Sequence, residues 1–245
     1  MIQLQAAKKP SQLTDAVVKA LTEKFNNSGN SVWKENYITE PLLAMSFGKC
    51  CFCETKVNEE SKYMEVEHFH AKSIYPNEVV EWKNLLPICK RCNIKKSNHD
   101  TKKYPIIHPI FDNPKQHLKL QDYRFYGKTE LGKLTKDIVD LNNRQRLVNV
   151  RSEIGVKLHE ELENLLQATQ DYIDNPITRR RNKIVGTLKN IMLEGTKEYE
   201  YSATAATVIL TDSNYQEIKQ LFESNNLWND EFKELEKHVE FCALI

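Results

Sequence analysis

The sequence predicts an α+β protein that is mostly α-helical, with a small zinc-stapled core between helical segments. Apolar residues recur at helical spacing near both ends of the 245-residue chain. Residues 50–109 lack this periodicity and are rich in Cys, His, Asn and Lys, and five of the six cysteines lie between Cys50 and Cys92. Such a composition is typical of a small domain that is held by a metal instead of a large apolar core.

These changes in composition divide the chain into three expected parts. Residues 1–46 form an N-terminal helical segment, residues 47–110 form the zinc-stapled core, and residues 111–245 form a C-terminal helical domain. The strands of the core are not visible as a pattern of their own. They follow from a family resemblance described below.

The first expected helix lies near the N-terminus, with Ser11 as its N-cap and the turn-rich stretch "NNSGN" as its end. Its apolar residues are Leu13, Val17, Ala20, Leu21 and Phe25. Three more helices are expected in the C-terminal half, one of them running from roughly 140 to 174. The apolar residues that define these three are Leu147, Val150, Ile154, Leu158, Leu162 and Leu165, then Ile177, Ile184, Leu188 and Ile191, and last Trp228, Phe232, Leu235 and Val239.

Charge is balanced over the whole chain but unevenly distributed along it. Lys and Arg number 35 against 34 Asp and Glu, which excludes a uniformly basic coat for nucleic acid. Residues 83–103 carry seven Lys or Arg and one acid, whereas residues 212–240 carry eight acids and three bases. The first region can meet phosphate, and the second would repel it.

The N-terminus has no apolar stretch behind its lysines, and no run approaches the roughly 18 apolar residues of a membrane span. We therefore expect a cytoplasmic protein without membrane contact. Because that compartment is reducing, the cysteines are interpreted as metal ligands before disulfides.

The cysteines form two matched pairs. Cys50 and Cys53 make one C-x2-C pair, Cys89 and Cys92 make a second, and 35 residues separate them. Four thiolates on two tight turns are the ligands of a tetrahedral structural zinc. A redox dithiol or buried apolar cysteines are the alternatives. Cys51 could replace Cys50 only in a C-x-C pair and is treated as a spare thiol, and Cys242 is expected to pack in a terminal helix.

The insert between the cysteine pairs contains "VEHFHAKS" and then two asparagines, in the order Glu67-His68, Asn84, Asn93. This order, between the two cysteine pairs, resembles the HNH endonuclease family in its zinc-stapled form, over residues 47–109. The resemblance implies a ββα-metal fold, in which a hairpin carries the histidine and a helix carries the last asparagine. Residues 47–110 are thus expected to be the nuclease core.

The resemblance also implies the roles of these residues in phosphodiester hydrolysis. An imidazole with a pKa near ~6.5 can accept a proton from water, so His68 is the expected general base. Glu67 and Asn93 are expected to supply oxygens to a catalytic Mg²⁺ or Mn²⁺ ion. Asn84 is expected to orient the imidazole.

Three positions leave alternatives open. His70 competes with His68 as the base, and His99 competes with Asn93 as the last metal ligand. Glu67 stands where many family members have Asp, and its longer side chain would shift the position of a bound metal ion.

Basic residues around and after the second cysteine pair are expected to contact phosphates of the nucleic acid. They are Lys90, Arg91, Lys95, Lys96, Lys102 and Lys103. A solvated helix face is the alternative explanation for these charges. The basic run at residues 178–183 is the next candidate.

Two further stretches, residues 104–118 and 134–151, resemble a narrower group, the HNH subunit of the Septu anti-phage system and of related retron effectors. His108 stands where that group would have Asn. The resemblance implies an ABC-type ATPase subunit as partner and DNA or tRNA as substrate. In retron versions, a reverse transcriptase with its msDNA is a further partner.

The acidic stretch from Asp212 to Glu240 is expected to dock on that ATPase partner. Its anchors would be Leu221, Phe222, Leu227, Trp228, Phe232 and Leu235. A helix that closes the protein's own core explains the same pattern. For the function as a whole, the main alternative is a non-catalytic zinc-knuckle protein that binds nucleic acid or serves as a scaffold, and a zinc redox sensor is a third possibility.

Overall fold

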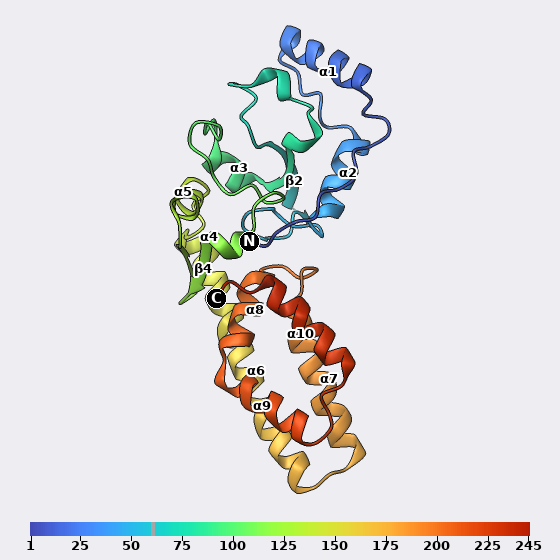
Figure 1. The fold of residues 1–245 in the computed structure, drawn as a ribbon, viewed down its shortest axis with the longest axis vertical. Helices are drawn as coiled ribbons and strands as arrows, with labels where there is room; N and C mark the ends of the chain where they lie inside the picture. The colour runs from blue at the N-terminus through green and yellow to red at the C-terminus, as the bar shows by residue number, and fades with distance from the viewer. Residues whose placement is uncertain (60–61) are drawn as a thin grey trace. The chain divides into compact units, whose positions relative to one another are not determined.

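The computed structural model describes residues 1–59 and 62–245 (Figure 1). These residues form two compact units. Unit 1 comprises Met1, Gln3–Leu118 and Tyr126–Leu141, and unit 2 comprises Ile2, Lys119–Phe125 and Asn142–Ile245. Helices dominate and two small sheets accompany them, which confirms the α+β class. None of the helices within the described ranges combines the length and hydrophobicity needed to cross a lipid bilayer.

Unit 1 contains the small sheet and several short helices. Its elements are α1 (Asp15–Ser28), α2 (Asn36–Met45), β1 (Asn58–Glu59), β2 (Lys62–His68), η1 (Pro76–Glu78), η2 (Trp82–Asn84), β3 (Leu85–Cys89), α3 (Lys90–Lys96), α4 (Pro114–His117) and α5 (Glu130–Ile138). The strands β4 (Leu118–Gln121) and β5 (Arg124–Gly127) form a separate two-stranded sheet.

The sheet of unit 1 has the strand order β1-β2-β3 and is antiparallel, with His68 opposite Leu85 and Met64 opposite Cys89. Because β3 is an edge strand, it tolerates Pro87, which has no N–H to donate. The helix α3 starts directly after β3. The β2–β3 hairpin followed by α3 is the arrangement that the family resemblance implied.

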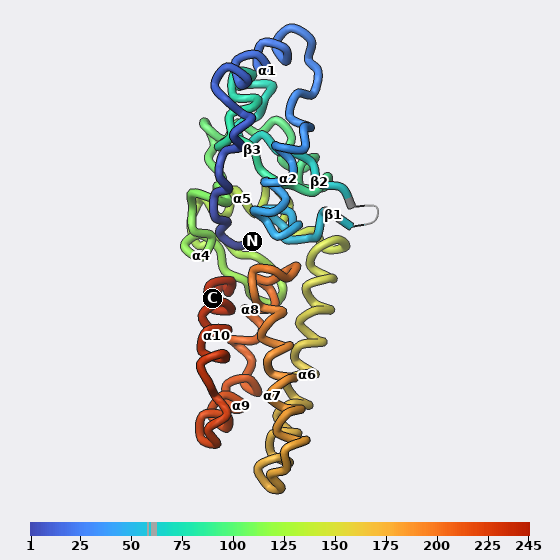
Figure 2. The backbone as a smooth tube through the Cα atoms, turned by 90° about the vertical axis from the view of Figure 1, so that its right-hand side faces the viewer, coloured from blue at the N-terminus to red at the C-terminus, as the bar shows by residue number. Residues whose placement is uncertain are grey.

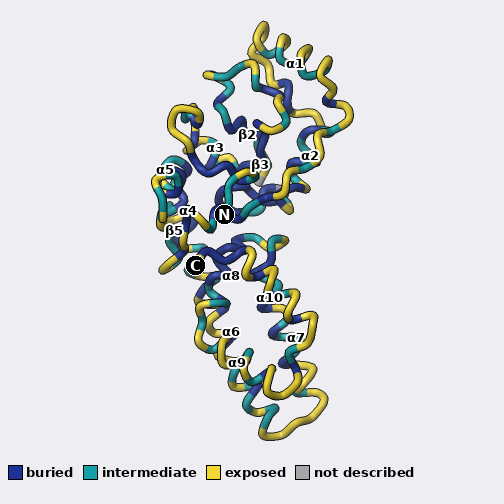
Figure 3. Tube along the Cα trace, in the orientation of Figure 1, coloured by how far each residue is buried: buried dark blue, intermediate teal, exposed yellow. Residues whose placement is uncertain are grey.

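The first helix begins later than expected. Thr14, not Ser11, is its N-cap, and the Thr14 hydroxyl accepts a hydrogen bond from the backbone N–H of Val17 at 3.3 Å. The prediction was wrong because Pro10 and Leu13 close a separate turn just before the helix. Gly29 ends the helix at φ 68°, a conformation that glycine adopts without strain. No residue of α1 is buried, and Figure 3 shows the helix largely in yellow.

Unit 2 is a bundle of helices: η3 (Arg144–Val148), a π-helical turn, then α6 (Asn149–Asp174), α7 (Thr178–Glu194), α8 (Ser202–Thr211), α9 (Ser213–Ser224) and α10 (Asp230–Cys242). The three helices expected from the sequence correspond to α6, α7 and α10. Figure 2 shows α6 and α7 running side by side, and the two helices pack together.

The centre of unit 2 is α8, which packs against α6, α7, α9 and α10. Seven of its ten residues are buried. A helix that is covered on all sides has no polar face, so its sequence "SATAATVILT" shows no amphipathic period. That is why the sequence pattern did not reveal it.

The acidic segment forms α9 and α10, and it completes the core of unit 2. Phe222, Leu227 and Phe232 are buried inside the unit, with the Phe222 and Phe232 rings packed edge to face at 5.7 Å between centroids. The expectation that these three residues anchor a partner was therefore wrong, because the unit itself buries them. Leu221, Trp228 and Leu235 remain partly exposed.

Candidate active site and zinc centre

The four paired cysteines meet in unit 1. The sulfur atoms of Cys50, Cys53, Cys89 and Cys92 all lie within 4.8 Å of one another. Cys89 is the N-cap of α3, and its sulfur accepts a hydrogen bond from the backbone N–H of Cys92 at 3.5 Å. One cysteine pair therefore sits on the junction between β3 and α3.

The other pair sits on a tight turn before β1. Gly48 and Glu54 both have positive φ and frame that turn, while Cys50 donates its N–H to the carbonyl of Thr55 at 2.9 Å. The neighbouring Cys51 donates its N–H to the carbonyl of Pro87 at 2.9 Å, which fastens the turn to β3. The Cys51 side chain does not belong to the cluster, in agreement with its interpretation as a spare thiol.

The cysteine cluster fits a structural zinc ion. Zn–S bonds of about 2.3 Å in a tetrahedron place the sulfurs about 3.8 Å apart. The Cys53 and Cys89 sulfurs are 3.6 Å apart. Without a cation, burial raises the pKa of the Cys50 thiol well above its usual range. Four clustered thiolates in this interior therefore need a positive charge among them.

His68 lies at the end of β2 and is 3% exposed. Its Nε2 is 2.9 Å from the carbonyl oxygen of Val79. Since a carbonyl can only accept a hydrogen bond, Nε2 carries the proton and the lone pair of the neutral ring is on Nδ1. Burial lowers the pKa of His68 to about 3. The ring is thus held as a neutral acceptor in a closed environment.

Trp33 covers this imidazole. The Trp33 and His68 rings meet edge to face, with 4.5 Å between their centroids. Trp33 is itself held by Phe25 of α1, at 5.8 Å between ring centroids, and by the Lys72 ammonium 5.1 Å from its ring centre. The loop between α1 and α2 therefore contributes the residue that shields the expected base from solvent.

Glu67 is buried against α3, where the Lys96 ammonium contacts its Oε1 at 2.5 Å. Lys96 is 1% exposed and also donates to the backbone carbonyl of His68 at 3.2 Å. The expectation that Lys96 contacts phosphate was wrong, because its ammonium group is buried and pairs with Glu67 inside the protein. Burial raises the pKa of Glu67, and the charge of Lys96 opposes that effect.

Asn93 projects from α3 toward the same strand. Its Nδ2 donates to Oε2 of Glu65 at 2.6 Å. Glu65 and Glu67 are two residues apart on β2 and therefore share one face of the strand. These side chains offer the hard oxygen atoms that Mg²⁺ and Mn²⁺ prefer. The sequence analysis missed Glu65, although the period of two along the strand could have indicated it.

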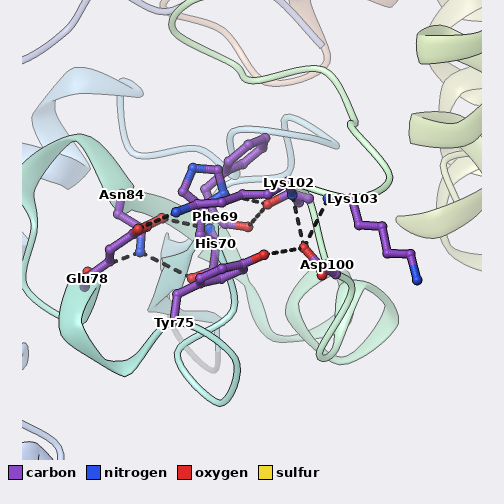
Figure 4. A network of polar contacts seen from close by, with 9 residues as sticks. Phe69, His70, Tyr75, Glu78, Asn84, Asp100, Lys102 and Lys103 are labelled. Carbon is purple, nitrogen blue, oxygen red and sulfur yellow. Dashed lines mark hydrogen bonds and ion pairs between the residues drawn. The ribbon is translucent and has the colours of Figure 1, made fainter.

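Asn84 acts as a clamp on the chain that follows His68 (Figure 4). Its Oδ1 accepts the backbone N–H of His70 at 2.7 Å, and its Nδ2 donates to the carbonyls of His70 at 3.2 Å and Glu78 at 3.1 Å. The backbone carbonyl of Asn84 accepts from the N–H of Phe69 at 2.9 Å. Asn84 thus fixes the backbone beyond the imidazole, not the His68 ring itself.

His99 lies apart from this arrangement of β2 and α3 side chains. Its Nε2 is 2.7 Å from the carbonyl oxygen of Tyr104, so this nitrogen donates within the loop after α3. Thr101 in the same loop contacts the His70 ring. No signal in the sequence connected Thr101 or Trp33 with the histidines, because tertiary packing alone brings them together.

The expected basic surface is smaller than the sequence indicated. Lys90, Lys95, Lys102 and Lys103 are exposed. Arg91 is half-buried, and its guanidinium donates to the carbonyls of Asp140 at 3.0 Å and Val139 at 3.3 Å and to the sulfur of Cys92 at 3.3 Å. Arg91 therefore braces α3 against the end of α5, and its contact with phosphate stays a prediction.

The chain is similar to two curated proteins. It is 43% identical to Septu protein PtuB from Bacillus thuringiensis over 247 residues, which cover 100% of this chain and 96% of that protein. It is 28% identical to Septu protein PtuB from Bacillus mycoides (strain KBAB4) over 141 residues, covering 44% of this chain and 46% of that protein. No family model matches the chain, and no solved structure matches it.

Proposed function

This chain belongs to the Septu protein PtuB family, and on that premise we propose that it is a metal-dependent HNH endonuclease. Its substrate is the phosphodiester backbone of DNA or tRNA, and it acts as the toxic effector of an anti-phage defence system. An ABC-type ATPase subunit of that system controls it. Where the system includes a retron, the reverse transcriptase and its msDNA are further partners.

The fixed tautomer of His68 carries this proposal. The carbonyl of Val79 holds the Nε2 proton, which leaves Nδ1 to accept a proton from water. The water oxygen then forms a bond to phosphorus, and the bond from phosphorus to one sugar oxygen breaks. The leaving sugar oxygen takes up a proton from solvent, and His68 returns its proton to solvent. Asn84 supports this step by fixing the backbone beside the base, at 2.7 Å from the N–H of His70.

Glu67 and Asn93 are the residues that would hold a Mg²⁺ or Mn²⁺ ion, and Glu65 is a further oxygen donor beside Asn93. When bound, such an ion stabilises negative charge on the scissile phosphate and on the leaving oxygen. The cysteine cluster has a separate role, since a structural zinc would hold the β3–α3 junction on which Asn93 depends.

The direct test is cleavage by the purified protein with Mg²⁺ or Mn²⁺, on plasmid DNA and on tRNA, alone and with the ATPase subunit. His68→Ala should lower the cleavage rate by about a hundredfold or more while zinc content and fold are kept. His70→Ala is measured alongside it to test the other imidazole. Full activity of His68→Ala together with an inactive His70→Ala would show that His70, and not His68, is the general base.

The burial of His68 favours one competing function. A base that is 3% exposed cannot reach a phosphate without a conformational change. A zinc-knuckle protein that binds nucleic acid or serves as a scaffold, without catalysis, would need no such change. Binding of nucleic acid without cleavage under every condition, including the complex with the ATPase subunit, would support that function instead.

A further inference from the structure

The second imidazole of this region, that of His70, has one ring nitrogen committed to the protein. Its Nδ1 lies 2.7 Å from the Thr101 hydroxyl oxygen, and that hydroxyl donates its proton to the carbonyl of Phe69 at 2.9 Å. Because a hydroxyl has one proton, the Thr101 oxygen must accept from His70, so Nδ1 carries the hydrogen. Within the described residues, Nε2 has no hydrogen-bond partner.

The ring of His70 is also rigidly placed. Asn84 binds the backbone N–H and carbonyl of His70 from one side, at 2.7 and 3.2 Å. Thr101 is buried and holds the ring from the loop after α3. Figure 4 shows Asn84 next to His70, with the hydrogen bonds that join them. The ring itself is only half-buried, so the protein holds its free edge in one orientation at a partly exposed position, as expected of a group that contacts a ligand.

The charged and titratable groups around this imidazole come from η1, from α3 and from the segment between α3 and α4. Glu78 of η1 pairs with Lys102, which lies 4.2 Å from the ring centre of Tyr75, and the Tyr75 hydroxyl donates to Asp100 at 2.8 Å. Lys96 of α3 is a second cation near the ring, and His108, in the segment between α3 and α4, is a further titratable neighbour.

These neighbours nearly balance, with two acids against two lysines. Burial is the main cause that lowers the pKa of His70, and Lys102 and Lys96 act in the same direction against Glu78 and Asp100. The ring is therefore neutral at neutral pH in the absence of a ligand. An added negative charge next to Nε2 would shift the balance toward the imidazolium form.

We propose that His70 contacts a phosphate of the nucleic-acid substrate through Nε2, and that the ring takes up a proton when the phosphate binds. The proton comes from solvent and forms an N–H bond at Nε2, which then donates a hydrogen bond to a non-bridging phosphate oxygen. No covalent bond of the substrate changes in this step. Lys103 on the adjoining loop is an exposed cation, whereas Lys102 is paired with Glu78. The inference rests on the proposed function, because it names a contact of that same substrate.

Two isosteric substitutions separate this role from a purely structural one. In His70→Asn, the amide nitrogen takes the place of Nδ1 and can still donate to Thr101, but nothing replaces Nε2. In His70→Gln, the amide nitrogen takes the place of Nε2 as a donor that does not titrate, and the contact with Thr101 is lost. Both variants are made in the full-length zinc-loaded protein, with folding checked by circular dichroism.

The measurement is the affinity for a fluorescein-labelled DNA oligonucleotide and for a labelled tRNA transcript, at about pH 6 and about pH 8. Mg²⁺ and Mn²⁺ are left out of the buffer to prevent cleavage, and no chelator is added, so that the structural zinc is kept. Wild type should bind more tightly at the lower pH. His70→Asn should bind about tenfold more weakly than wild type at pH ~6, and its affinity should change much less than that of wild type between the two pH values. The affinity of His70→Gln should change little between the two pH values.

If folded His70→Asn binds like wild type at both pH values, the inference is overturned, and His70 only braces the loop through Thr101. In that outcome the proposed nuclease function is unaffected, since His68→Ala tests it separately. If wild type binds neither DNA nor tRNA, both the inference and the proposed function fail.

Discussion

The two units of the molecule are stabilised in different ways. Unit 2 surrounds helix α8 with four longer helices. Its core is mostly apolar, although it also buries Arg151 and the hydroxyl groups of several Ser and Thr residues. Unit 1 buries a cysteine cluster, an ion pair between Glu67 and Lys96, and the polar side chain of Asn84. The comparison teaches that the proposed catalytic unit depends on specific partners for each buried polar group, whereas the helical unit depends on apolar packing.

The largest expected difference between the units comes from the loss of zinc. Cys89→Ser should abolish zinc binding and unfold the region 47–110, because metal binding contributes about 10–16 kcal/mol in small zinc domains. Unit 2 should keep its helices, since no ligand of the cluster belongs to it. Metal analysis should find about one zinc per wild-type chain, and limited proteolysis should show which unit opens in the variant.

Cys51→Ser is the matched control for this experiment. Its thiol lies next to Cys50 but outside the cluster, so zinc content should be unchanged. Normal zinc content in Cys89→Ser would contradict the assignment of the centre.

The converse experiment breaks the apolar core of unit 2. Phe232→Ala should lower the free energy of unfolding of that unit by about 4 kcal/mol, because it leaves a cavity where the ring packs on Phe222. Zinc content should stay normal. Denaturant unfolding followed by circular dichroism measures the change, and an effect below about 1 kcal/mol would show that Phe232 is not part of a packed core.

Phe241→Ala serves as the control on the same helix, since Phe241 is 44% exposed and its removal should have little effect on stability. Deletion of residues 212–245 is not a suitable test of docking to the ATPase subunit, because it removes Phe222, Phe232 and Leu244 from the core.

The adjacent residues Lys95 and Lys96 test how far unit 1 relies on paired charges. Lys96→Met should destabilise the protein by about 3 kcal/mol, because it leaves Glu67 charged and buried without its partner. Lys95 is 49% exposed, so Lys95→Met should change stability little. Lys95→Met should instead weaken nucleic-acid binding and reduce its dependence on salt concentration. Equal effects of the two substitutions on unfolding would contradict the assigned burial.

The smallest expected effect concerns Trp33, which shields the His68 ring from solvent. Trp33→Ala should raise the pKa of His68 from about 3 toward its ordinary value, since burial is the main cause of the lowered value. An NMR titration of the ring measures it, and Trp33→Phe, which keeps an aromatic ring, is the control. An unchanged pKa in Trp33→Ala would show that other groups enclose His68.

The same pKa predicts how stability depends on pH. Between about pH 6.5 and about pH 3, the unfolded chain binds a proton on His68 that the folded chain does not. This residue therefore contributes to a loss of stability as the pH falls through that range. In Trp33→Ala the contribution should be smaller, which thermal unfolding at several pH values can show.

Much of the fold and of the zinc centre could be predicted from the sequence alone. The paired spacing of Cys50, Cys53, Cys89 and Cys92 identified the cluster, because two C-x2-C turns can present four thiolates to one ion whatever surrounds them. The period of apolar residues located α6, α7 and α10, because each of these helices has one solvent-facing side. The order of Glu67, His68, Asn84 and Asn93 indicated the candidate site by resemblance, and their chemical roles stay predictions.

Tertiary structure decided which chemical groups are available. Lys95 and Lys96 are equivalent in sequence, yet the turn of α3 points one to solvent and the other to Glu67. The same holds for His68 and His70, since Trp33 covers one ring and Thr101 orients the other. His70 and Thr101 are 31 positions apart in the chain. Local periodicity contains no information about contacts between residues so far apart. Burial, tautomer and charge pairing depend on those distant neighbours, which is the physical reason why the sequence identified the candidate residues and only the folded chain determined their states.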